Sequence, residues 1–155
     1  MKRQRIYLDT SVIGGCFDEE FAPWSNGLMR DFREQRFAPV VSVLVAAEIA
    51  PAPNFVQERY VELVELGAEL LEQSDVSEAL EARYHEHEIV PQTFAADALH
   101  IALATVAQVD LLVSWNFKHI VRFEKIRLFN AVNREMGYKE IEIYSPREVT
   151  QYETR

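Results

Sequence analysis

The chain has 155 residues, 48 % of them hydrophobic, which suffices for one domain with a substantial core, and no stretch approaches the roughly 20 apolar residues of a membrane span. Its single cysteine, Cys16, excludes an intrachain disulfide and a zinc site built on several thiolates. A formal net charge of −9 argues against unspecific binding to nucleic acid, although basic residues gather within 2–5 and 118–127.

The chain begins with two strand–helix units. RIYLD at residues 5–9 is short and almost wholly apolar, which suits a central parallel strand covered on both faces. A glycine-containing loop is expected next, and then a helix at 24–35 with its apolar residues on one side. The second predicted strand, 38–43, leads almost directly into a short helix at 44–50, which the sequence PAP at 51–53 ends.

The same alternation continues to the end of the sequence. Asp75 and Glu78 have the spacing of a capping box, and Thr93 is the expected N-cap of its helix. This pattern predicts an α/β fold with a mostly parallel sheet and helices on both faces. No change in composition marks a linker, so we expect one cytoplasmic domain over residues 1–155. The remaining predicted elements are a helix at 55–67, a strand at 68–72, helices at 75–88 and 93–108, a strand at 110–115, a helix at 123–137 and a strand at 140–145.

Four polar residues occupy positions where the local pattern favours apolar or small side chains. Asp9 ends the first strand, and Asn116 follows the strand at 110–115. Glu48 and Asp97 lie in alanine-rich helical segments, where small neighbours let a ligand come close. Because working residues in parallel sheets collect outside the carboxyl ends of the strands, these four form the candidate catalytic set.

Three carboxylates brought together would repel one another unless a cation lay between them. Hard oxygen ligands suit Mg²⁺ or Mn²⁺, and such ions assist the hydrolysis of phosphodiesters. Each acid also has a structural interpretation: Asp9 as an N-cap, Glu48 as a half-exposed helix residue, and Asp97 as an acid favoured by the helix dipole. His100, one turn after Asp97, either orients that carboxylate or packs in the core.

With these residues in hand, the sequence resembles the PIN-domain family, and within it the VapC-type toxins of bacterial and archaeal toxin–antitoxin pairs. The matching segments are YLDTSVIGG, SVLVAAEI, FAADALHIALA and DLLVSWNFKHI, whose order and spacing cover nearly the whole chain. The resemblance implies a three-layer α/β/α fold with a parallel sheet of about five strands. It also implies a ribonuclease that cleaves single-stranded RNA with Mg²⁺ or Mn²⁺.

The resemblance further assigns roles to residues and implies partners. It assigns the metal to Asp9, Glu48 and Asp97, and a polar, substrate-side role to Ser11. Toxins of this type usually form homodimers and are inhibited by an antitoxin whose C-terminal segment, often with an arginine, enters the acidic site. The negative charge of this chain agrees with such a partner, so RNA, an antitoxin and a second copy are expected, and a membrane is not.

One segment departs from the family's pattern. After the fourth strand the family commonly has a further acid, but here Asn116 and His119 stand in that stretch. Asn116 is expected to ligate a metal or hold its water, whereas His119 and the basic Lys118 are expected to contact the RNA backbone. We therefore expect a site for one metal ion rather than for two. Trp115 either stacks a base or belongs to the core.

Other folds that place an aspartate after the first strand fit less well. A haloacid dehalogenase-type phosphatase needs a second aspartate where Ser11 stands, and a receiver domain needs a paired acid before Asp9. A dinucleotide-binding fold needs G-x-G-x-x-G at this place. The alternative from another functional class is a catalytically weak PIN fold that binds RNA or an antitoxin.

Overall fold

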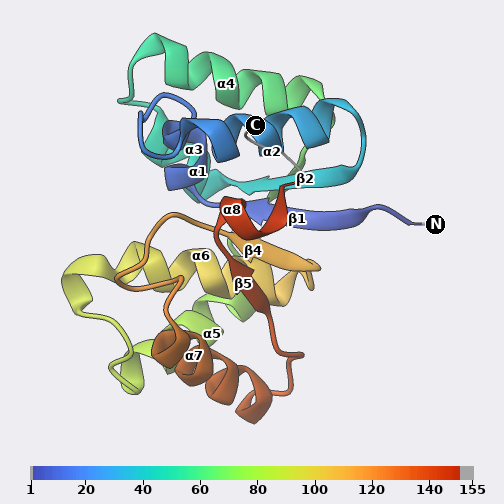
Figure 1. Cartoon of the computed structure of the whole chain (residues 1–155). Helices are drawn as coiled ribbons and strands as arrows, with labels where there is room; N and C mark the ends of the chain where they lie inside the picture. Colours follow the sequence, from blue (N-terminus) through green and yellow to red (C-terminus); the bar gives the residue numbers. More distant parts are fainter. Residues whose placement is uncertain (1, 151–155) are drawn as a thin grey trace.

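A parallel β-sheet runs through the middle of the chain and separates two layers of helices (Figure 1). The computed structural model describes residues 2–150, and within them the strand order is β3-β2-β1-β4-β5, with every neighbouring pair parallel. This confirms the predicted α/β fold and its five-stranded parallel sheet. The strands are β1 (Gln4–Leu8), β2 (Phe37–Ser42), β3 (Glu69–Leu71), β4 (Leu111–Val113) and β5 (Glu142–Tyr144).

The first four helices cover one face of the sheet, and α5, α6 and α7 cover the other (Figure 1). Within the first layer α1 contacts α2, α3 and α4, and within the second α5 packs on both α6 and α7. The helices on the first face are α1 (Thr10–Gly15), α2 (Ala22–Arg33), α3 (Val43–Ile49) and α4 (Asn54–Glu65). Those on the second face are α5 (Asp75–Glu86), α6 (Ala95–Val106) and α7 (Phe123–Glu135).

The central position of β1 explains its composition. Its register joins Ile6 to Pro39 of β2 on one side and to Leu111 of β4 on the other. With helices above and below, Ile6, Tyr7 and Leu8 are completely buried. A strand covered on both faces selects a continuous apolar run, which is the pattern read in the sequence.

Three local predictions were wrong. The segment after Asp9 is not a loop but the short helix α1. Helix α5 is capped by Ser74 and Ser77, whose side chains each bond the other's backbone N–H, rather than by Asp75 and Glu78. Thr93 lies inside a 3₁₀ turn, Gln92–Phe94, so α6 begins two residues later than expected.

The C-terminal segment returns across the first helix layer. Helix α8 (Pro146–Val149) packs on α2. The guanidinium of Arg147 lies 5.1 Å from the ring centre of Trp24, and the Thr150 hydroxyl donates to the buried Asp31 carboxylate at 2.8 Å. This segment therefore fastens α2 to the end of β5. Within residues 2–150 no helix has the length and apolar character needed to cross a bilayer.

Candidate functional site

The strand order creates a switch point beside β1. The chain moves outward from β1 to β2 and β3, and then returns to place β4 and β5 on the opposite side of β1. Connections after β1 and β4 therefore diverge at the carboxyl edge of the sheet, which is where such folds form their sites. Asp9 follows β1, and Ser114 and Asn116 follow β4. Helix α6 leads into β4, so its first turn, with Asp97, reaches the same edge.

Asp9 is a buried carboxylate held by neutral hydroxyl groups. Its residue is 4 % exposed. Although it occupies the N-cap position of α1, its Oδ1 accepts from Ser11 Oγ at 2.6 Å and its Oδ2 from Ser114 Oγ at 2.5 Å. Burial raises the pKa of Asp9, and the positive potential of His100 together with the serine hydrogen bonds offsets this only in part. This position therefore favours a nearby cation.

Glu48 is more exposed and is bound by two donors. Its side chain is 35 % exposed, and its Oε1 accepts from Thr10 Oγ1 at 2.7 Å and contacts His100 Nε2 at 2.7 Å. Burial acts to raise the pKa of Glu48, but the hydrogen bonds from His100 and Thr10 outweigh it and lower that pKa overall. Thr10 directly follows Asp9, so Glu48 is tied to the chain segment that carries the first acid.

His100 connects Glu48 to the centre of the sheet. Its Nδ1 lies 2.7 Å from the hydroxyl of Tyr7, which also lies 2.8 Å from Ser42 Oγ. Burial raises the pKa of Tyr7, so the hydroxyl keeps its proton and remains a neutral partner of both groups. Nε2, on the other side of the ring, faces Glu48 Oε1, so the imidazole connects the Tyr7 hydroxyl to that carboxylate. Of the two roles open to His100 in the sequence, it is buried in the core and orients Glu48, not Asp97.

Asp97 is oriented by a different histidine. Its Oδ2 lies 2.8 Å from Nδ1 of the buried His119. The loop that carries His119 is shaped by Asn116, whose Oδ1 accepts the backbone N–H groups of Lys118 at 3.2 Å and His119 at 2.9 Å. The amide oxygen expected to face a metal therefore serves this turn. His119, expected to contact substrate, holds Asp97 instead.

Hydrogen bonds connect the first acid to the last. Ser114 Oγ donates to Asp9 and accepts the backbone N–H of Asn116 at 2.9 Å. Asn116 holds the turn that ends at His119, and His119 contacts Asp97. Asp9 and Asp97 are thus joined through one loop after β4, while Glu48 joins them through Thr10. The sequence identified the acids, but not Ser114, which lies in the motif DLLVSWNFKHI without any local signal of its role.

The donor set suits Mg²⁺ or Mn²⁺ chemically, because it offers carboxylate and hydroxyl oxygens and a buried acid whose partners are neutral. Within residues 2–150, however, no three His, Cys, Asp or Glu side chains already stand in positions that could hold a metal ion. The acids are turned toward serine, threonine and histidine donors.

Lys118 and Trp115 have opposite environments. Trp115 is 7 % exposed, stacks on Phe21 with ring centres 4.2 Å apart, and donates from Nε1 to Ser25 Oγ at 2.8 Å. Of the two roles considered for it, Trp115 therefore has the core role. Lys118 is exposed, and its Nζ lies 5.6 Å from the ring centre of Phe94.

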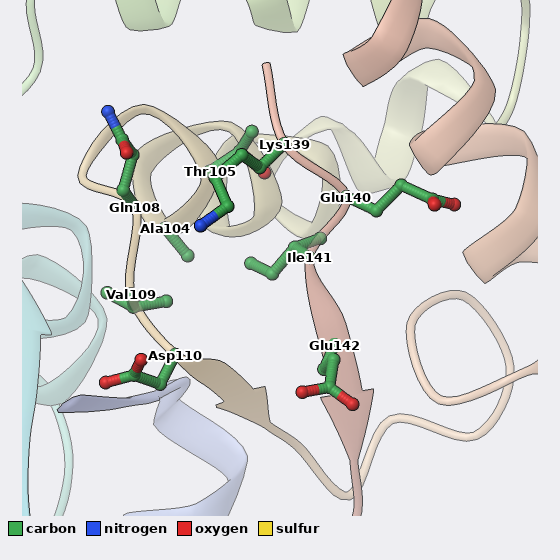
Figure 2. A pocket seen from close by; sticks show the side chains of 9 residues that line it. All are labelled: Ala104, Thr105, Gln108, Val109, Asp110, Lys139, Glu140, Ile141 and Glu142. Carbon is green, nitrogen blue, oxygen red and sulfur yellow. The ribbon is translucent and has the colours of Figure 1, made fainter. Parts of the chain in front are cut away.

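A well-defined pocket of about 220 Å³ lies at the opposite, amino edge of the sheet (Figure 2). Its lining includes Asp110 and Glu142, which precede or begin β4 and β5, and the end of α6 at Thr105. The candidate acids do not line it. The side chain of Asp110 accepts the backbone N–H of Arg5 at 2.6 Å, so this acid also serves the sheet edge. The candidate site is therefore the carboxyl edge, not this pocket.

Comparison with solved structures reveals the same fold elsewhere. FitAcB from Neisseria gonorrhoeae matches with a TM-score of 0.60 and 16 % identity, covering 93 % of this chain and 99 % of that chain. VapBC2 from Rickettsia felis, solved bound to a DNA fragment from its promoter, matches with a TM-score of 0.55 and 12 % identity, covering 90 % and 97 %. These matches confirm the VapC-like PIN fold predicted from the sequence. No protein-family model and no curated protein sequence matches the chain.

Proposed function

We propose that the chain is a divalent-metal-dependent endoribonuclease that cleaves single-stranded RNA, acting as the toxin of a type II toxin–antitoxin pair. One observation carries the proposal. Asp9 and Asp97 are connected by hydrogen bonds through the loop after β4. Glu48 is bound by Thr10, the residue directly after Asp9, at the same carboxyl edge of a VapC-like sheet. The three acids are the residues to which the family resemblance assigns the metal.

In the proposed reaction the protein supplies ligands and holds them in place. Asp9, Glu48 and Asp97 would bind Mg²⁺ or Mn²⁺, which when bound lowers the pKa of a water and neutralises charge on the scissile phosphate. The hydroxyls of Ser11 and Ser114 fix the Asp9 carboxylate within its buried position.

The two histidines are positioning residues. His100 orients Glu48 from the buried side through its bond to Tyr7, and His119 orients Asp97. Such partners of metal ligands typically change metal affinity or activity by about 10- to 100-fold when removed. Asn116 contributes to the site by accepting the backbone N–H groups that shape the turn before His119. The exposed ammonium of Lys118 would contact an RNA phosphate.

The proposed partners follow from the same likeness. An antitoxin would occupy the acidic edge with a basic segment, and its binding would compete with metal and RNA. A homodimer is the proposed assembly. Co-expression with the neighbouring reading frame, followed by mass measurement of the purified complex, tests both the antitoxin and the homodimer. A monomer that does not bind the protein encoded by that reading frame would contradict both proposals.

Cleavage of an unstructured RNA by the purified chain tests the activity. We expect cleavage with Mn²⁺ or Mg²⁺, none with EDTA, and loss of cleavage in Asp9→Asn and Asp97→Asn with the circular dichroism spectrum unchanged. Asp110→Asn is the matched control, because Asp110 stands at the other end of β4 and should leave cleavage intact. Cleavage that survives both site substitutions would refute the metal-site proposal.

A binding module without strong catalysis is the second candidate. It is favoured by the absence, within residues 2–150, of a ready-made cluster of three metal-ligating side chains, and by Asn116 and His119 in the stretch where the family commonly has an acid. Mn²⁺ that leaves the melting temperature of wild type unchanged, together with tight RNA or antitoxin binding, would support this second function over the first.

A further inference from the structure

We propose that Phe94 and Phe117 form a stacking platform for unpaired RNA bases, with Lys118 on the adjoining phosphate. This inference rests on the proposed function, since it concerns the substrate of the same edge, but it gives a role to two phenylalanines to which the family resemblance assigns none. It also gives the exposed aromatic side chains beside the acids a specific task.

The rings of Phe94 and Phe117 are both exposed, and both residues are close in sequence to residues of the candidate site. Phe94 is 42 % exposed and Phe117 49 % exposed, whereas the neighbouring Trp115 is buried. Phe94 precedes α6 three residues before Asp97, and Phe117 directly follows Asn116 in the loop after β4. Large apolar groups left in water beside a polar site indicate a contact surface.

Each ring is also held from its inner side. The ring centre of Phe94 lies 4.5 Å from that of His119, the histidine that contacts Asp97. The ring centre of Phe117 lies 6.1 Å from that of Trp115. A ring held by an aromatic neighbour loses little conformational entropy when a base stacks on it, which makes it an effective platform.

The charge beside the rings favours an RNA strand as their ligand. Lys118 lies between Phe117 and His119 in the sequence, and its Nζ is 5.6 Å from the ring centre of Phe94. An ammonium at this place attracts a phosphate of the RNA strand. Base stacking on aromatic rings next to a cation is the general mode of single-strand binding. A duplex would hide the faces of its bases, so the platform selects unpaired RNA.

Binding measured without metal tests the platform separately from catalysis. The probe is a fluorescein-labelled, unstructured oligoribonucleotide, and anisotropy is recorded in EDTA with the full chain. We expect Phe94→Leu and Phe117→Leu each to weaken binding about tenfold, because leucine keeps an apolar contact but has no face on which a base can stack. Phe117→Trp should restore or tighten binding, which a purely structural role for Phe117 would not explain.

Phe123→Leu is the matched control. Phe123 is 76 % exposed and has the Arg127 guanidinium 5.6 Å from its ring centre, so it offers the same chemistry at the start of α7. Its substitution should leave the Kd unchanged. Melting temperatures of all variants establish that each is folded before binding is compared.

The outcomes separate the two proposals. Binding that depends on both phenylalanines, in a chain that cleaves no RNA with Mn²⁺, supports the platform and contradicts the nuclease. Cleavage by wild type with RNA binding unchanged in both leucine variants overturns the platform and leaves the nuclease standing. The platform is also wrong if wild type binds no single-stranded RNA, or if the leucine variants lose only the binding of a basic peptide.

Discussion

Substitution of Tyr7 by phenylalanine should distinguish the contribution of its hydroxyl to the candidate site from its contribution to the stability of the core. Tyr7 is fully buried in the central strand, and its hydroxyl contacts both Ser42 Oγ and His100 Nδ1. Phenylalanine keeps the ring and its packing but removes that hydroxyl. Ser42 Oγ still accepts the backbone N–H of Val45 at 3.2 Å, whereas Nδ1 of His100 becomes a buried polar atom that has lost its hydrogen-bond partner.

The expected magnitude follows from that loss. Leaving one buried polar atom unpaired costs about 1–3 kcal/mol of unfolding free energy. For a chain of this length, 1 kcal/mol corresponds to about 2–4 °C, so Tm should fall by about 2–12 °C. His100 would then be less firmly oriented toward Glu48. Mn²⁺ affinity or RNA cleavage should therefore also fall by about 10- to 100-fold.

Tyr84→Phe provides the comparison. Tyr84 is equally buried and its hydroxyl donates to Asn133, in the core between α5 and α7. Urea unfolding of both variants should give similar losses of stability, whereas isothermal titration with Mn²⁺ and RNA cleavage should be impaired only in Tyr7→Phe. Equal metal affinity in the two tyrosine variants would refute the role assigned to the Tyr7–His100–Glu48 connection.

Three further predictions follow from single positions. Gly15→Ala would place a Cβ 2.7 Å from Nε1 of Trp115 and should cost about 1–3 kcal/mol of stability in urea unfolding, whereas Gly14→Ala, whose Cβ meets no atom within 4 Å, should be neutral or stabilising. Burial raises the pKa of Cys16 to about 11, so at pH 8 its reaction with a disulfide reagent should be at least about 100-fold slower in the folded protein than in denaturant. Burial raises the pKa of Asp9, so the stabilising contribution of this carboxyl group is present at low pH and lost as pH rises. Asp9→Asn should therefore raise the metal-free Tm at pH 7.5 but not at pH 4. Mn²⁺ should raise the Tm of wild type but not that of Asp9→Asn.

Much of the fold could be predicted because its signals are local. Continuous apolar runs mark the strands, since each is covered on both faces, and glycines at positive φ end two of the helices at Gly67 and Gly137 as expected. The short helix α1 was missed because its two glycines and six-residue length give no periodic pattern. The cap of α5 shifted to Ser74 because its extended backbone lets its side chain reach Ser77 N.

The position of the three acids at one edge of the sheet could be predicted from the sequence, but their hydrogen-bond partners could not. Strand ends and alanine-rich helices mark the acids, because topology alone brings those positions to one edge. Their partners are distant in sequence: Ser114 is 105 residues from Asp9, and His100 is 52 residues from Glu48. No local pattern states which of two histidines will face which acid. Only the packing of α6 against the loop after β4 shows that His100 contacts Glu48 and that His119 contacts Asp97.

The choice of partners at the site has a consequence for charge. Elsewhere the chain pairs its acids with arginine, as in Arg5–Glu69 and Arg33–Glu62, whose ions neutralise each other at the surface. The site acids contact serine and threonine hydroxyls and the imidazoles of His100 and His119, and no arginine or lysine side chain is hydrogen-bonded to them within residues 2–150. An arginine there would satisfy the acids permanently. Hydroxyl and imidazole partners instead hold them in a region that stays negative, and this is the electrostatic condition that a divalent cation requires.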